Sequence, residues 1–132
     1  MKRAIEKILK AHGRLDEFNS NPEDGFHVRI ENEPYMPLSI ERHDSMVTVT
    51  HYFEQNGDLI PDPDMEFEIC PDGLWIPIAI QQPIGGYSRV FETIDGVKYV
   101  RPKLMRELKS FSRMWSRKLL QQGFARGARS PA

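Results

Sequence analysis

The chain has 132 residues and carries 18 Lys and Arg against 19 Asp and Glu, so its formal net charge is −1. That length predicts one domain with a core large enough to be stable without disulfides or a structural metal ion. No apolar run approaches the ~18 residues of a membrane span, and the basic N-terminal segment lacks the apolar stretch of a secretion signal. Cys70 is the single cysteine, which excludes an internal disulfide and favours a cytoplasmic protein.

The charge is unevenly distributed along the chain. Residues 1–100 hold 9 basic and 18 acidic side chains, whereas residues 101–132 hold 9 basic and 1 acidic. Such asymmetry indicates either an interaction tail or charge matching within the fold.

Two segments near the N-terminus have clear periodicity. Apolar residues at helical spacing predict a short amphipathic helix over residues 2–12, ended by Gly13. Alternating apolar and polar residues then predict strands over 26–31 and 35–42.

The stretch 46–69 has the most regular pattern in the chain. β-Branched and aromatic residues alternate on both faces of its first part, which predicts a strand inside a sheet. Asn56-Gly57 supplies the two positive φ values of a type I′ turn. Because Pro61 and Pro63 cannot donate to a ladder, we expect them to interrupt the pairing and leave a wide polar tip over 54–64.

Three shorter strands are expected after this hairpin. One covers 74–80, where Pro77 requires an edge position or a bulge. Residues 87–94 and 97–100 form a last pair around Asp95-Gly96. Short strands joined by tight turns predict an antiparallel meander.

The clearest helix spans 101–122, with Pro102 in its first turn. Its apolar stripe consists of Leu104, Leu108, Phe111, Trp115 and Leu119. The expected fold is therefore α+β: a five- or six-stranded antiparallel meander sheet, the long C-terminal helix across one face, and a short N-terminal helix. Residues 1–124 form this single domain, and residues 125–132 are expected to be a disordered tail.

The run HYFEQNGDLIPDPDMEFEI, preceded by PYMPLSIER, resembles an uncharacterised domain family of small bacterial proteins. Members of that family often occur on plasmids, conjugative elements and phages. The likeness extends from about Glu31 to the end of the C-terminal helix, with Phe53 where tyrosine is more usual. The resemblance implies an accessory protein of a mobile element or of its host, and it implies no reaction.

Acidic and polar residues gather in and beside the hairpin tip. These candidate binding residues are His51, Glu54, Gln55, Asn56, Asp58, Asp62, Asp64 and Glu66. Carboxylates suit Ca²⁺ or Mg²⁺ and a nearby histidine suits a general base, so one alternative is a metal-dependent hydrolase or nuclease. However, Phe67 stands where an EF-hand loop needs glycine, and no catalytic motif is present. We therefore favour a protein with no metal, no cofactor and no enzymatic activity.

A second alternative is nucleic-acid binding through the C-terminal helix. Its candidate phosphate contacts are Arg106, Lys109, Arg113 and Arg117. Because no aromatic residue interleaves with them and the net charge is −1, we expect such binding to be weak.

The interpretation we favour is a non-enzymatic binding module with an unidentified protein partner. Aromatic side chains are the usual anchors of such interfaces. The sequence offers Tyr35, Tyr52, Phe53, Trp75 and Tyr87 for this role, provided that some of them are exposed.

Overall fold

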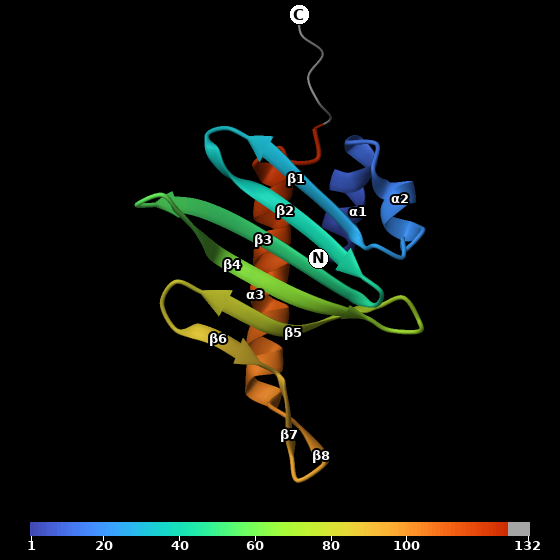
Figure 1. The fold of residues 1–132 in the computed structure, drawn as a ribbon, viewed down its shortest axis with the longest axis vertical. Helices are drawn as coiled ribbons and strands as arrows, with labels where there is room; N and C mark the ends of the chain where they lie inside the picture. Colours follow the sequence, from blue (N-terminus) through green and yellow to red (C-terminus); the bar gives the residue numbers. More distant parts are fainter. Residues whose placement is uncertain (127–132) are drawn as a thin grey trace, which may run out of the picture.

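The computed structural model of the protein describes residues 1–126 and has the expected α+β fold (Figure 1). The elements in chain order are α1 (Lys2–Ala11), α2 (Leu15–Asn19), β1 (Phe26–Asn32), β2 (Tyr35–His43), β3 (Met46–Gln55), β4 (Asp58–Ile69), β5 (Trp75–Gln82), β6 (Gly86–Arg89), β7 (Phe91–Ile94), β8 (Val97–Val100) and α3 (Pro102–Gln121). The first six strands form one antiparallel sheet in the order β1-β2-β3-β4-β5-β6. The predicted meander is thus confirmed with six strands, and β3 lies inside it.

The core lies between one face of this sheet and the helices. α3 crosses that face (Figure 1), and its stripe buries Leu108, Trp115 and Leu119 while Leu104 and Phe111 are half-buried. α1 packs beside α3, and its own apolar stripe also faces the core. The opposite face of the sheet carries no helix (Figure 1), and we call it the open face.

The β3–β4 hairpin corrects the expectation of a wide polar tip. Pairing continues to Gln55 and Asp58, and the reversal is the tight turn of Asn56 and Gly57, with φ values of 53° and 83°. Pro61 and Pro63 lie within β4. The sheet tolerates both prolines because β5 pairs with β4 only from Asp64 onward. On that side of residues 61–63 no strand accepts backbone hydrogen bonds, so the missing N–H groups cost no pairing there. A bulge opposite Thr50–Tyr52 takes up the extra residue.

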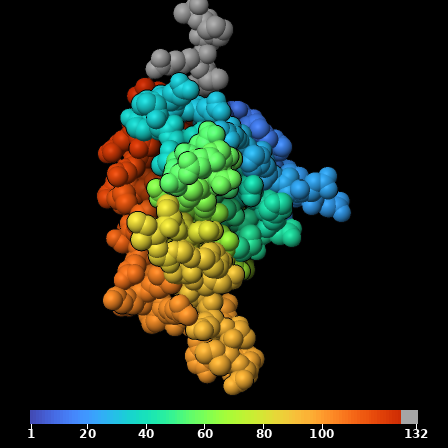
Figure 2. Space-filling model, turned by 60° about the vertical axis from the view of Figure 1, so that its left-hand side comes forward, coloured from blue at the N-terminus to red at the C-terminus, as the bar shows by residue number. Residues whose placement is uncertain are grey.

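The expected strand over 87–94 is also corrected, because it breaks at Val90. This residue is fully buried; its N–H donates to the Ile78 carbonyl at 2.8 Å, and its carbonyl accepts from Arg101 N–H at 2.8 Å. The anchored chain turns outward there, so β7 and β8 pair as a separate two-stranded sheet. We call residues 91–100 the arm, and Figure 2 shows it as a lobe projecting from the body.

Other local expectations have simple outcomes. Pro77 lies at a register shift between β4 and β5, as the bulge interpretation required. Ala125 packs partly against the core, and the rest of the expected tail from residue 127 onward lies outside the described residues. Within residues 1–126, no helix combines the length and apolar character needed to cross a membrane.

Candidate functional site

The candidate residues of the β3–β4 hairpin do not converge on one site. Four of them, Glu54, Gln55, Asn56 and Asp58, are exposed at the turn. The other four divide between the two faces of the sheet, because side chains alternate along each strand and the bulge near Thr50 shifts the alternation in β4.

His51 lies on the core face, beneath α3. Its ring packs against Trp115 and Phe124 at centroid distances of 5.4 and 5.5 Å, and its Nδ1 lies 3.2 Å from the Pro37 carbonyl oxygen. Burial lowers the pKa of His51, and the hydrogen bond to the Pro37 carbonyl and the charge of Asp62 only partly oppose this effect. The imidazole is therefore neutral near pH 7.

His51 and Asp62 share a mainly apolar cavity of about 240 Å³ at the edge of α3. Its other walls come from β2, β4 and α3, including Tyr35, Met114 and Trp115. His51 is only 5% exposed and bonds to the Pro37 carbonyl, so it acts here as a packed core residue.

Asp64 and Glu66 lie on the open face instead. One carboxylate oxygen of Asp64, Oδ1, is buried and has no hydrogen-bond partner in the part of the chain that the structure describes. Burial, then the nearby charges of Glu66 and Glu41, raise the pKa of Asp64 to about 6, and Thr50 partly offsets this. The phenol of Tyr87 donates to Glu66 Oε2 at 3.1 Å.

Asp62 and Asp64 lie on opposite faces of the sheet, which counts against the hydrolase alternative. A divalent cation needs several oxygens directed at one point. Among residues 1–126, no group of three or more His, Cys, Asp or Glu side chains is arranged to hold a metal ion. The hairpin acids therefore do not form the ligand set on which that alternative depends.

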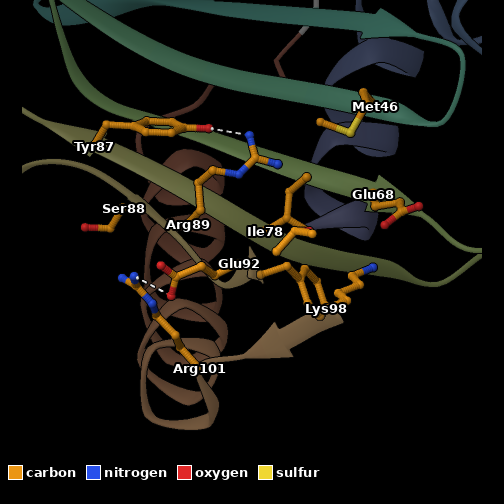
Figure 3. A pocket seen from close by; sticks show the side chains of 11 residues that line it. Met46, Glu68, Ile78, Tyr87, Ser88, Arg89, Glu92, Lys98 and Arg101 are labelled. Atoms are coloured by element: carbon orange, nitrogen blue, oxygen red, sulfur yellow. Dashed lines mark hydrogen bonds and ion pairs between the residues drawn. The ribbon is translucent and has the colours of Figure 1, made fainter. Parts of the chain in front are cut away.

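A hollow lies between the open face and the arm. It measures about 670 Å³, and we call it the arm pocket (Figure 3). Its lining consists of Met46, Glu68, Ile78, Tyr87, Ser88, Arg89, Phe91, Glu92, Thr93, Lys98 and Arg101. The candidates drawn from the sequence included only Tyr87 from this set, because the pocket joins separate segments of the chain, from Met46 on β3 to Arg101 at the start of α3.

Three cationic side chains of the arm pocket have different environments. Arg101 Nη2 pairs with Glu92 Oε2 at 3.1 Å, and Lys98 Nζ lies 4.2 Å above the Phe91 ring. Arg89 Nη1 donates to the Tyr87 hydroxyl at 3.3 Å, and within the described residues it makes no ion pair. Figure 3 shows Arg89 over the middle of the pocket. Its charge is therefore available to an incoming carboxylate.

The arm itself exposes apolar side chains on both of its faces. The exposed fractions are 49% for Ile94, 52% for Val97, 50% for Tyr99 and 51% for Val100. A strand packed on a body would instead alternate between buried and exposed residues. The sequence shows apolar residues at both odd and even positions around Asp95-Gly96. This pattern indicates an exposed surface only when the arm is known to leave the main sheet.

The remaining sequence candidates occupy separate surfaces. Among the aromatic anchors, Tyr35 and Tyr87 are exposed, whereas Trp75 packs on Phe18 and Phe67. The four candidate phosphate contacts, Arg106, Lys109, Arg113 and Arg117, are all exposed on α3.

Comparison with known proteins adds a family but no function. No curated protein and no solved structure matches the chain. A family model described as a domain of unknown function, DUF6908, matches residues 3–125. This result agrees with the uncharacterised domain family expected from the hairpin sequence. Because the match covers most of the chain, the protein belongs to the DUF6908 family.

Proposed function

We propose that the protein is a non-enzymatic binding module that contacts a protein partner through the arm. The carrying observation is that an apolar hairpin stands away from the body with both faces exposed. A two-stranded hairpin alone in water is marginally stable. Exposed apolar patches of this kind mark interaction surfaces in soluble proteins.

The chemistry of the arm supports this proposal. Tyr99 shares a face of the arm with Ile94 and Val97, and Tyr87 is exposed and lines the arm pocket. Lys98, Arg101 and Glu92 add charged side chains in the same part of the molecule, where they line the arm pocket. An aromatic and aliphatic centre within a charged rim is the usual composition of a protein–protein interface.

The biological setting is part of the same proposal. The resemblance of the hairpin sequence to proteins of plasmids, conjugative elements and phages supports an accessory role in a bacterial mobile element or its host. The single cysteine, Cys70, supports a cytoplasmic location.

Site-specific photo-crosslinking in cells that naturally express the protein tests the role of the arm. A photoreactive phenylalanine analogue replaces Tyr99 in one variant and Leu59, which is exposed on the β3–β4 hairpin, in the control. We expect a crosslinked protein adduct from position 99 and none from position 59. Adding Val97→Ser and Val100→Ser should abolish the adduct without unfolding the protein. The proposal fails if position 99 gives no adduct or if both positions give the same one.

A further inference from the structure

The tip of the arm combines apolar surface with one carboxylate. Asp95 and Gly96 form the turn with φ values of 50° and 78°, and Ile94 and Val97 flank them. All four residues are exposed. The tip therefore presents a negative charge between two aliphatic side chains.

The arm pocket has complementary properties. Ile78, Met46 and Phe91 supply apolar surface. Arg89, Lys98 and Arg101 supply positive charge against the carboxylates of Glu68 and Glu92, and Arg101 already pairs with Glu92, so the charged lining keeps an excess of one positive charge. Arg89 donates to the Tyr87 hydroxyl but makes no ion pair within the described residues, so a carboxylate entering the pocket gains a charge-assisted hydrogen bond without displacing another carboxylate.

The arm cannot place its own tip in its own pocket. Near the tip, Thr93 and its cross-strand partner Lys98 line the pocket, so the next pair, Ile94 and Val97, lies on the opposite face of the arm. Glu92 lines the pocket from that second face only at the base of the arm. Figures 1 and 2 show the tip extending away from the body. An arm tip that fills the pocket therefore comes from another molecule.

We propose that this molecule is a second copy of the chain, and that two copies form a symmetric dimer in which the arm of each enters the arm pocket of the other. Asp95 of each copy then pairs with Arg89 of the other, while Ile94 and Val97 cover the apolar floor. Each copy offers one arm and one pocket, so a two-fold axis satisfies both and closes the assembly. This inference rests on the proposed role of the arm and names its partner.

Charge exchange with sedimentation analysis tests the dimer. Asp95→Lys and Arg89→Glu should each weaken dimerisation by about ten-fold or more, because each places like charges together. The double variant should recover most of the lost affinity, since the pair is restored with its signs reversed. Arg89→Gln, which removes the charge alone, should have a smaller effect.

A second hairpin supplies the matched control. Asp58 follows the Asn56-Gly57 turn and is exposed, as Asp95 is, but it lies outside the arm pocket. Asp58→Lys should leave the sedimentation coefficient unchanged. Melting temperatures measured for every variant identify any change that reflects unfolding instead of dissociation.

The outcomes separate this inference from the proposed function. A wild-type protein that stays monomeric at roughly 100 μM, a concentration at which weak specific dimers form, overturns the dimer. A dimer that persists equally in all charge variants also overturns it, because another surface then holds the copies together. If the protein is monomeric while position 99 still crosslinks to a different protein, the binding module stands and only the self-docking is wrong.

Discussion

Replacing Asp64 by asparagine should stabilise the protein, and more so at high pH. The carboxyl group lies on the open face near Glu66 and Glu41, and one of its oxygens is buried without a partner. Burial and these two charges raise its pKa from 3.8 to about 6. The folded protein therefore opposes ionisation of this one group, and Asp64→Asn removes the ionisable group while keeping its size.

The sign follows from proton binding. Between pH 4 and pH 6 the folded state holds the Asp64 proton more tightly than the unfolded state, so the free energy of unfolding falls as pH rises through this window. A shift from 3.8 to about 6 corresponds to roughly 3 kcal/mol at full strength. Because the group is only half-buried, solvent screening reduces this to about 1–2 kcal/mol.

Urea unfolding at pH 5 and pH 8 measures the effect. Asp64→Asn should gain about 1–2 kcal/mol over the wild type at pH 8 and clearly less at pH 5. Comparing variant with wild type at each pH cancels the contribution of the titrating groups that do not interact with Asp64. Asp58→Asn, the same change at an exposed position on β4, is the control and should gain less stability at pH 8 than Asp64→Asn, because its side chain is not buried. Equal effects of Asp64→Asn at both pH values, or a loss at pH 8, would refute the electrostatic account.

Four further measurements address the fold and the alternatives. Trp115→Ala should cost about 3–5 kcal/mol in thermal or chemical unfolding, since the ring is buried between α3 and the sheet; a negligible change would mean that α3 does not dock through its stripe. Gly57→Val should cost about 1–3 kcal/mol because φ is +83° there, whereas Gly57→Asn should cost much less. Calorimetry with Ca²⁺, Mg²⁺ and Mn²⁺ should show binding no tighter than about millimolar, and a micromolar isotherm that Asp62→Asn abolishes would revive the hydrolase. DNA binding at ~0.15 M salt should be no tighter than about 10⁻⁵ M; submicromolar binding lost in Arg113→Glu/Arg117→Glu would favour the nucleic-acid alternative.

Much of the fold was predictable because it depends on neighbouring residues in the chain. Alternation places β1 to β5, the period of α3 places its buried stripe, and Asn56-Gly57 forms the expected turn. Each of these features follows from side-chain spacing or from backbone sterics over a few residues. Pro77 also matched its expected bulge.

The prolines of β4 and the arm depended on contacts between distant segments. Pro61 has no backbone N–H, so it interrupts a strand only where a neighbouring strand would accept a hydrogen bond from that position. The pairing of β5 with β4 begins at Asp64 and does not include Pro61. Whether residues 87–94 form one strand is decided at Val90, which the core holds through Ile78. The residues next to Pro61 or Val90 in the sequence indicate neither the end of the β4–β5 pairing nor the anchoring of Val90.

The candidate site was the least predictable part for the same reason. The sequence by itself determined which residues were acidic, basic or apolar, and so identified the hairpin acids and the basic helix as candidates. Only the tertiary structure decided that Asp62 and Asp64 face opposite ways and that Arg89 meets the arm across a pocket. Packing of the whole chain decides which distant residues lie close together. The hydrophobic effect is non-directional and depends on the total apolar area buried, so no single residue spacing in the sequence determines these contacts.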